Sequence, residues 1–363
     1  MMFIALRRLP QAATLLRALL DEQPGAQRVR LELARVLDLM GDEAGARRAL
    51  REAQAGGLPA DVARLVDRYS AALRAQKPLG ASIDIALAPD SNINRATRAQ
   101  TLGTVLGDFV LEEDARQRSG VGLALRGQGY ARLPLGSGAN LFGRVSGSAD
   151  LYRDGAFNDF ALAATAGPEL RSGADRFSLE AGGLWRWYGG QPYSRAATIG
   201  LNYFHPLGRK AQLRATGSLA FVDNRRNALQ DGRTYSASLS YERALSARAG
   251  VGITLSAERQ ALREAAYSSW SAQATLFAYR ELGPITLVAT LGHGRLWADQ
   301  RFPLFPEARA DRLYRASLGA TFRNLRIGIF APFLRATYER NRSNTEIHDF
   351  RKLRTEIGVS RAF

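Results

Sequence analysis

The sequence contains no cysteine and only three histidines, and each shortage excludes a class of site. Without cysteine the chain has no disulfide, no thiolate metal site and no cysteine nucleophile. His205, His293 and His348 are never three or four residues apart, so a helical zinc motif is absent. No apolar run approaches the roughly 18 residues of a membrane-spanning helix, and the mean hydropathy is −0.21. These features exclude a helical membrane protein but not a β-barrel, whose strands alternate polar and apolar residues.

Positive charge is abundant: 50 Lys and Arg stand against 34 Asp and Glu in 363 residues, a net charge of +16. Lysine occurs only at positions 77, 210 and 352, so the excess is almost all arginine. The arginines are spread along the whole chain rather than gathered in one stripe, which argues against a nucleic-acid partner.

Composition divides the chain near residue 80. Before that point Phe3 and Tyr69 are the only aromatic residues, and the segment is rich in Ala, Leu and Arg, which favour helix. After Gly80, glycine, aromatic and alternating apolar residues dominate, with turn-forming clusters at short intervals. We therefore predict a helical domain over residues 1–79 and a many-stranded β domain over residues 80–363.

The helical part has a repeat signal of 34 residues. Its expected apolar faces are Leu33, Ala34 and Leu37, then Ala46, Leu50 and Ala53, preceded 34 residues earlier by Ala12, Leu16 and Leu19. Small residues at helix crossings and this period resemble tetratricopeptide repeats, although an ordinary amphipathic hairpin is the alternative. A last helix over residues 61–75 is expected to cap the stack. Because the first repeat lacks its first helix and no export signal is visible, we expect the natural protein to begin earlier, with a signal peptide.

The β domain alternates with a period of two. In Ala211–Phe221, for example, apolar residues alternate with Gln212, Arg214, Thr216 and Ser218. About fourteen such runs are predicted, and most exceed the nine to eleven residues of a tilted membrane strand. They are 81–90, 117–133, 139–152, 159–168, 176–189, 194–205, 211–223, 233–245, 250–263, 267–281, 285–298, 312–323, 327–341 and 351–363.

Short turns and longer charged loops alternate between these runs, the layout of bacterial outer-membrane barrels. Tight turns are expected near 134–136, 206–208, 246–249, 282–284 and 324–326, and longer loops at 91–116, 223–232, 260–266, 298–311 and 341–349. An even strand count places both barrel ends, and the helices, in the periplasm. The final Phe363 resembles the carboxy-terminal signal read by the outer-membrane assembly machinery. A soluble β-sandwich or a soluble barrel with a filled lumen is the alternative, but its core would have to bury many Arg and Ser side chains.

The barrel prediction also suggests a role for the arginines within the predicted strands. We expect many of them to point into the lumen, where water and carboxylates would screen them and a basic lining would favour anionic or polar cargo. The simpler alternative is that each only pairs with an acid on the next strand. The arginines in question are Arg126, Arg132, Arg144, Arg214, Arg263, Arg295 and Arg335.

Signals for catalysis are scarce. His348 with Asp349 is the only sequence-adjacent candidate for an outer-rim hydrolase, and loop histidines are usually just solvated. Glycines never fall into the spacings that bind nucleotides. We assign no catalytic residue, cofactor or metal ligand and expect a protein that is not an enzyme.

The junction between the two parts is the most distinctive segment. A strand that ends in Pro89, Asp90, Ser91, Asn92, Ile93 and Asn94, followed by Ala96 and Thr97, comes directly after the helices and before the strand pattern. This arrangement resembles the surface lipoprotein assembly modifier family. Consecutive Asx and Ser turns could equally make the segment a simple anchor for the first loop, so a loop-anchoring role and a role in cargo contact stand side by side.

The resemblance implies a non-enzymatic, monomeric outer-membrane translocator that helps specific lipoproteins reach the cell surface. The barrel would be the conduit, the periplasmic helices would engage the lipoprotein cargo, and outer-membrane lipid and the barrel assembly machinery would be further partners. The alternatives are an exopolysaccharide export channel, which also joins helical repeats to a barrel, and a passive porin, which would need no helices.

Overall fold

The computed structural model describes residues 9–22, 27–40, 42, 46, 78–136, 138–208, 210–246, 248–325 and 327–362. The chain divides into two compact units, Met1–Lys77 and Pro78–Phe363. No described helix is long and apolar enough to cross a membrane.

The first unit contains a helical hairpin of α2 (Leu9–Glu22) and α3 (Gln27–Leu39). Its two helices pack through small and apolar side chains: Ala12, Ala13, Leu33, Ala34, Val36 and Leu37 are buried, with Leu9, Leu16 and Leu20 against them. Ala46, beyond the end of α3, is buried in the same cluster. The predicted face of α3 is therefore buried, but a tetratricopeptide repeat is not established by two short helices. The predicted faces at Leu50 and Ala53 and the helix over 61–75 lie outside the described residues, as does the side chain of Leu19.

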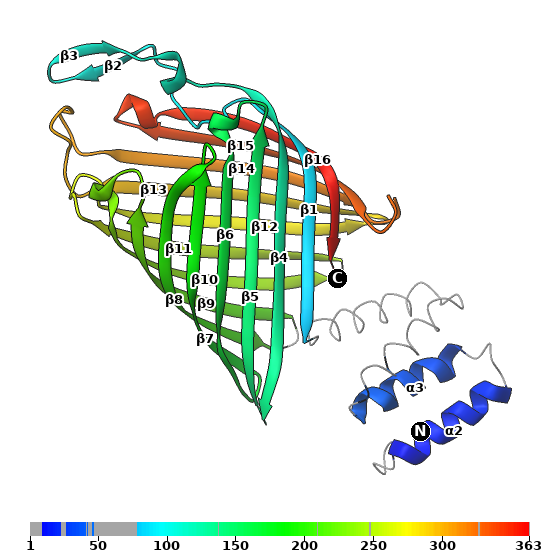
Figure 1. Ribbon diagram of the computed structural model, residues 1–363. Coiled ribbons are helices and arrows are strands. Elements are labelled where there is room, and N and C mark those ends of the chain that lie inside the picture. The colour runs from blue at the N-terminus through cyan, green and yellow to red at the C-terminus, as the bar shows by residue number, and fades with distance from the viewer. Residues whose placement is uncertain are drawn as a thin grey trace. The chain divides into compact units, whose positions relative to one another are not determined.

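The second unit is a closed antiparallel barrel of fourteen strands, as the sequence predicted. In Figure 1 the first barrel strand lies between the second and the last. The barrel strands are β1 (Leu79–Asp90), β4 (Gly120–Gly136), β5 (Ala139–Tyr152), β6 (Asp159–Ser172), β7 (Asp175–Tyr188), β8 (Gln191–Leu207), β9 (Ala211–Asn224), β10 (Gly232–Ser246), β11 (Ala249–Leu262), β12 (Ser269–Leu282), β13 (Ile285–Ala298), β14 (Ala310–Phe322), β15 (Ala331–Ser343) and β16 (Phe350–Ala362).

The two faces of the barrel wall differ in chemistry because successive side chains of a strand point to opposite sides. Leu87, Leu291 and Leu318 are about 60% exposed on the outer face, which suits a wall that lipid covers. Polar residues of the alternate positions, such as Asp84 and Arg126, line the lumen. The short turns lie at the end where β1 begins, and the longer loops lie at the end where β1 finishes. By the layout of outer-membrane barrels, the loop end is the extracellular end.

Two segments differ from the sequence prediction. The loop expected at 91–116 contains a small hairpin, β2 (Thr101–Thr104) with β3 (Gly107–Val110), drawn beyond the loop end of the barrel in Figure 1. The strand predicted from residue 327 begins only at Ala331. Ile327 and Phe330 instead bond to each other's backbone around Gly328, whose φ of +62° suits a tight turn and not a strand.

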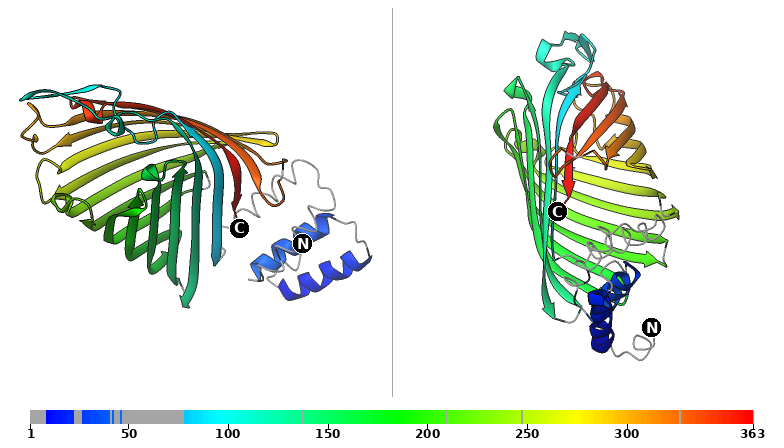
Figure 2. Two further views of the ribbon diagram at one scale, coloured as in Figure 1. Left: turned by 45° about the horizontal axis from the view of Figure 1, so that its top comes forward. Right: turned by 90° about the vertical axis from the view of Figure 1, so that its right-hand side faces the viewer.

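The seam between the first and last strands closes the barrel, and the two strands lie side by side in every view (Figures 1 and 2). Pairing runs from Ser82↔Ala362 to Leu87↔Ile357 and resumes at Asp90↔Arg354. At Gly358 a Cβ atom would lie 2.1 Å from the backbone oxygen of Ile85, so only glycine fits this approach. The seam is therefore tight at its centre and irregular near its extracellular end.

Candidate functional site at the barrel seam

The junction segment, defined here as Pro89–Thr97, begins where the pairing of β1 with β16 is interrupted. Proline has no backbone N–H to donate to a ladder, and Pro89 stands between the paired positions 87 and 90. Ser91 restores the contact: its N–H donates to the Leu353 backbone oxygen at 2.9 Å, and its Oγ accepts from the Leu353 N–H at 2.8 Å. A serine side chain thus continues the ladder past the end of β1.

Asn92 is fully buried and ties its own turn to β16. Its Nδ2 donates to the backbone oxygens of Ala96 at 2.9 Å and Arg351 at 3.0 Å, while its Oδ1 accepts from the Ala96 N–H at 3.0 Å. Its backbone oxygen accepts from Lys352 Nζ at 3.1 Å. Every polar group of the asparagine side chain is therefore used, and the turn is fixed onto β16.

The next residues attach the same turn to the chain that enters β4. Ile93 N–H donates to the Arg118 backbone oxygen at 2.8 Å. Asn94 Nδ2 donates to the Arg116 oxygen at 2.7 Å, and its Oδ1 accepts from the Arg118 N–H at 3.1 Å. Thr97 is buried and forms a parallel bridge with Arg116. The junction segment therefore spans the gap between β16 and the entry to β4.

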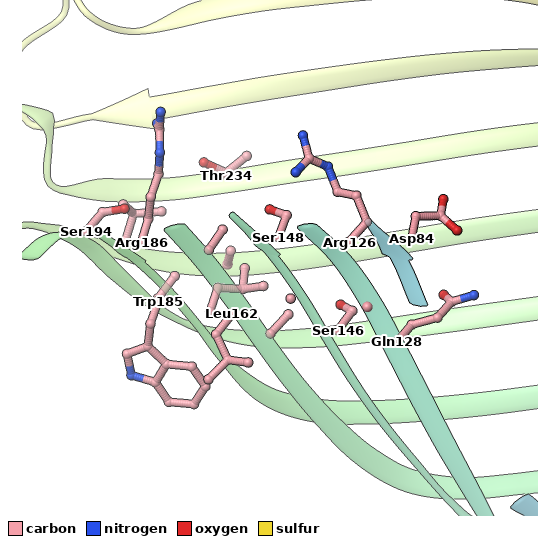
Figure 3. A pocket seen from close by; sticks show the side chains of 18 of the residues that line it. Asp84, Arg126, Gln128, Ser146, Ser148, Leu162, Trp185, Arg186, Ser194 and Thr234 are labelled. Carbon is pink, nitrogen blue, oxygen red and sulfur yellow. The ribbon is translucent and has the colours of Figure 1, made fainter. Parts of the chain in front are cut away.

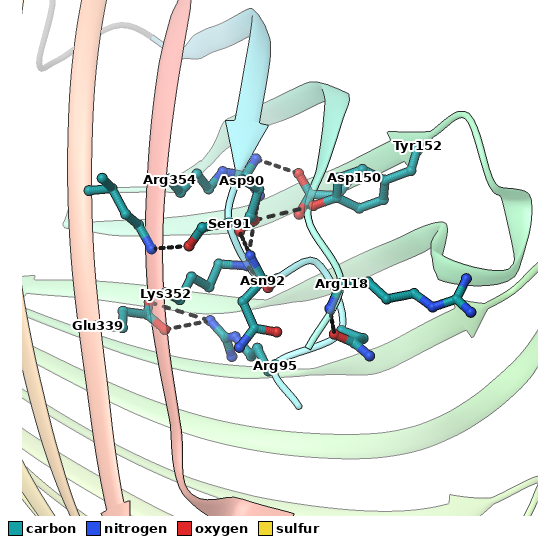
Figure 4. Close-up of polar contacts among 12 residues, drawn as sticks. Asp90, Ser91, Asn92, Arg95, Arg118, Asp150, Tyr152, Glu339, Lys352 and Arg354 are labelled. Atoms are coloured by element: carbon teal, nitrogen blue, oxygen red, sulfur yellow. Dashed lines mark hydrogen bonds and ion pairs between the residues drawn. The ribbon is translucent and has the colours of Figure 1, made fainter. Parts of the chain in front are cut away.

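A chain of charges lies beneath this turn, at the top of the lumen (Figure 4). Asp90, at the end of β1, is bound by Lys352 Nζ at 2.5 Å and accepts from the Asn92 N–H at 2.9 Å. Arg354 donates to Asp150 at 2.6 Å and also contacts Glu356 at 3.1 Å. Lys352, Arg354 and Asp90 are all largely shielded from solvent, so each charge depends on these partners.

Arg95 links the junction segment to β15, the strand next to β16. It is the only described residue other than glycine with a positive φ, +51°, and its guanidinium lies 3.2 Å from Glu339 on β15. The same carboxylate binds Arg315 of β14 at 2.8 Å. Figure 4 shows Arg95 and Glu339 directed toward each other. A strained backbone held by a buried partner is typical of functional loops, and here it places a cation over the lumen.

Below the junction the lumen contains two hollows. One, of about 500 Å³, is lined by Arg95, Arg126, Asp150, Lys352 and Arg354 together with neighbours on the facing strands. The other, of about 610 Å³, is lined by Asp84, Gln128, Ser146 and Ser148 on one side and Ser194 and Thr234 on the other (Figure 3). The first hollow is lined mainly by charged and polar groups and suits a polar passenger, whereas the wall of the second also includes Leu162, Leu184 and Trp185.

The predicted lumenal arginines divide into three groups. Arg126, Arg132, Arg144 and Arg335 contact lumenal carboxylates at 2.8–3.1 Å, and their partners are Asp150, Glu169, Glu180 and Glu356. Arg214 occupies a lumen-facing position of β9. The prediction is wrong for the other two: Arg263 lies in the loop after β11, 3.6 Å from Asp231, and Arg295 shares the outward face of β13 with Leu291 and Trp297.

Within the described residues, the remaining candidate, His348 with Asp349, has no hydrogen bond between its two side chains and none from the His348 ring to a serine. Arg340 holds both oxygens of Asp349, at 2.5 and 3.0 Å. Burial, with the charge of Arg309 second, lowers the pKa of His348 to about 4, so the ring is neutral at pH 7. Among the described residues no three His, Asp or Glu side chains come together to hold a metal ion. Phe363 lies outside the described residues.

Sequence reasoning missed the partners of the junction segment. In the sequence, Lys352 and Arg354 look like ordinary polar residues of the alternating last strand, and Glu339 looks like any other acidic residue of a predicted strand. A usable signal was Lys352, the only lysine within a predicted strand of a chain that otherwise uses arginine there, because a slender ammonium fits a buried site beside one carboxylate.

Comparison with known proteins gives a family for the barrel. A family model described as surface lipoprotein assembly modifier matches residues 81–363. No curated protein matches the chain. Similar solved structures include a bacterial polysaccharide outer membrane secretin (11% identity, 78% of this chain and 98% of that chain, TM-score 0.41). They also include the trimer form of OmpT from Vibrio cholerae (8%, 78% and 99%, 0.42) and OmpF of Salmonella typhi in complex with daunomycin (7%, 78% and 97%, 0.42).

Proposed function

Because the chain belongs to the surface lipoprotein assembly modifier family and forms an outer-membrane β-barrel, we propose that it helps specific lipoproteins cross to the cell surface. Family and fold indicate a transporter and not an enzyme. In this proposal the lumen is the conduit, residues 1–79 engage the lipoprotein in the periplasm, and the barrel acts as a monomer. The barrel assembly machinery inserts it, using the end of β16.

The junction segment is the observation that supports this proposal best. It joins β1, β16 and the entry to β4 through Ser91, Asn92 and Asn94, and it places Arg95 over the lumen. A passive pore needs no such segment. We propose that it holds the extracellular mouth of the conduit in shape and contacts cargo through Arg95, which keeps its side chain about half exposed.

Protease shaving of intact cells tests the proposal. We expect a strain that lacks the gene to lose one or a few lipoproteins from its surface while their periplasmic pools remain, and the full-length gene to restore them. An unchanged set of surface lipoproteins contradicts the proposal. Loss of a secreted polysaccharide or of solute uptake instead would assign the barrel to polymer export or passive diffusion.

The role of Arg95 is tested in the same assay with Arg95→Gln, which keeps length and hydrogen bonding but removes the charge. Arg301, an exposed arginine of the loop after β13 that bonds only backbone oxygens, supplies the matched control Arg301→Gln. We expect Arg95→Gln alone to lower lipoprotein display at equal barrel abundance. Equal display by both variants would leave the junction segment with the loop-anchoring role only.

A further inference from the structure

Arginines gather on the outer wall of the barrel at its extracellular end, where no lumenal function uses them. They occupy outward positions of the last four strands, next to aromatic residues such as Trp297 and Tyr338 that are almost half exposed. Below them on the same faces lie Leu291, Leu318 and Leu353, more than half exposed. The cluster, called the outer arginine patch, consists of Arg295 on β13, Arg312 on β14, Arg340 and Arg342 on β15, and Arg351 on β16.

The register places these like charges directly opposite one another. Arg295 pairs with Arg312, Arg312 with Arg342, and Arg340 with Arg351. Like charges directly opposite in a sheet repel and destabilise it. Within the described part of the chain, only Arg340 of the patch has a carboxylate partner, Asp349. The strands thus maintain a repulsion that an anion from outside the chain would relieve.

A hollow of about 440 Å³ marks where such an anion fits. It is lined by Arg98, Arg340, Arg342 and Arg351, with Tyr338 at its side. Its two acids are already engaged: Asp349 is held by Arg340, and Glu346 accepts from the Gly103 N–H at 2.7 Å. Guanidinium groups bind phosphate oxygens through paired, charge-assisted hydrogen bonds. With Arg340 neutralised by Asp349, the hollow still has Arg98, Arg342 and Arg351 against Glu346, an excess of positive charge that suits a phosphorylated group.

The height of the patch identifies the occupant. The arginines lie within a few residues of the strand ends, between the apolar face of the wall and the extracellular loops. At this level of an outer membrane the wall meets the headgroups of the external leaflet. We propose that the outer arginine patch is a binding site for the phosphates of a phosphorylated glycolipid of that leaflet. The inference goes beyond lipoprotein transport and depends only on the orientation of the barrel in the membrane.

Binding to the full chain in detergent tests the site. The probes are diphosphorylated lipid A, the same lipid after enzymatic removal of both phosphates, and inorganic phosphate alone. We expect diphosphorylated lipid A to bind at least about tenfold more tightly than the dephosphorylated lipid, because two charge-assisted contacts would be lost. Equal affinity for the two lipids, or equally tight binding of inorganic phosphate, would overturn the proposal.

The variant Arg312→Gln with Arg342→Gln removes two charges from the patch. Its matched control, Arg243→Gln with Arg280→Gln, removes two outward arginines near the periplasmic ends of β10 and β12. We expect the patch variant to bind lipid A about tenfold or more weakly and the control to stay within about twofold of the wild type. Equal affinities of the two variants contradict the proposal.

Folding and cargo binding are separated from lipid binding by two further measurements. If the double variant fails to give a heat-modifiable folded band, Arg351→Gln alone is measured with the same probes and the same expected loss. If either variant loses lipoprotein display at unchanged lipid A affinity, the patch is a cargo surface and the lipid proposal is wrong.

Discussion

At the residue scale, the side chain of Asn92 makes three hydrogen bonds at the seam. Its amide satisfies backbone groups of its own turn and of β16 inside a site without access to water. A buried backbone group that loses its partner costs about 1–3 kcal/mol, so one asparagine can decide whether the turn stays closed.

We therefore expect Asn92→Ala to destabilise the folded barrel by about 2 kcal/mol, because the Arg351 oxygen and the Ala96 N–H and oxygen lose their partner. The measurement is the urea midpoint of the barrel in lipid vesicles, followed by tryptophan fluorescence. Asn344→Ala is the control: Asn344 also makes several hydrogen bonds, but it is exposed and water can replace them. Equal losses in both variants would show that burial of Asn92 has no special effect.

His348 makes stability depend on pH. Burial lowers its pKa in the folded chain to about 4 from 6.5. Between these values the unfolded chain binds more protons than the folded chain, so stability is lost as pH falls from about 6.5 toward 4. We expect the urea midpoint of the wild type to fall more between pH 7 and pH 4.5 than that of His348→Gln. Parallel pH profiles of the two proteins would assign the loss to other groups.

At the scale of single elements, the strands could be predicted from the alternation of polar and apolar residues, because lipid on one side of the wall and water on the other impose that alternation. Lipid outside and water inside select alternate residues along a strand, and this alternation appears directly in the exposure of successive side chains of β10 and β12. Prediction fails where that constraint ends. The β2–β3 hairpin lies in an exposed loop with no lipid on one side to impose alternation. Residues 327–330 continue the apolar pattern, although Gly328 turns the chain.

Only the junction segment of the candidate site could be predicted from the sequence, and its partners on other strands could not. Pro89, Asp90, Ser91 and Asn92 stood out because turn-forming residues cluster there. Their partners could not be found the same way, since Lys352 meets Asn92 across 260 residues and only the closure of the barrel brings them together. The direction of Arg295 was misjudged for the same reason: facing depends on register, and one residue of shift exchanges lumen and lipid.

Closure itself depends on a close approach at Gly358. We expect Gly358→Ala to destabilise the seam by about 2 kcal/mol, because its Cβ would overlap Ile85 O and Ala86. Gly127→Ala is the matched control: Gly127 pairs with β1 from the other side, and a Cβ there has no atom nearer than 3.9 Å. The midpoint of heat modification on gels compares them. A smaller loss of stability for Gly358→Ala than for Gly127→Ala would show that the backbones at the seam can move apart to accommodate a Cβ atom.

At the scale of the whole molecule, the contacts favour a barrel whose wall stays closed while cargo passes through the lumen. Ser91 and Asn92 extend the contacts of the seam past the end of β1, and Lys352 neutralises Asp90 beside it, while two hollows lie in the lumen below. Opening the wall would expose these buried charges to lipid, at a high cost in free energy.

A crosslink across the seam distinguishes the two routes, and the natural absence of cysteine makes the experiment clean. Ile85 and Val359 are directly paired, and opposite residues of antiparallel strands lie at a separation that a disulfide spans. We expect Ile85→Cys with Val359→Cys to oxidise readily and to display lipoproteins at the wild-type level, because the lumen is the conduit.

The matched control joins two strands away from the seam, Leu239→Cys with Leu255→Cys on β10 and β11, which are paired in the same outward manner. If oxidation abolished display for the seam pair and reduction restored it, while the control pair stayed active, cargo would have to pass between β1 and β16. The junction segment would then hold β1 and β16 together until the wall opens for cargo. In that case Asn92→Ala should raise the rate of lipoprotein display instead of lowering it. Normal display by both oxidised pairs assigns transport to the lumen and leaves Asn92 a purely stabilising part.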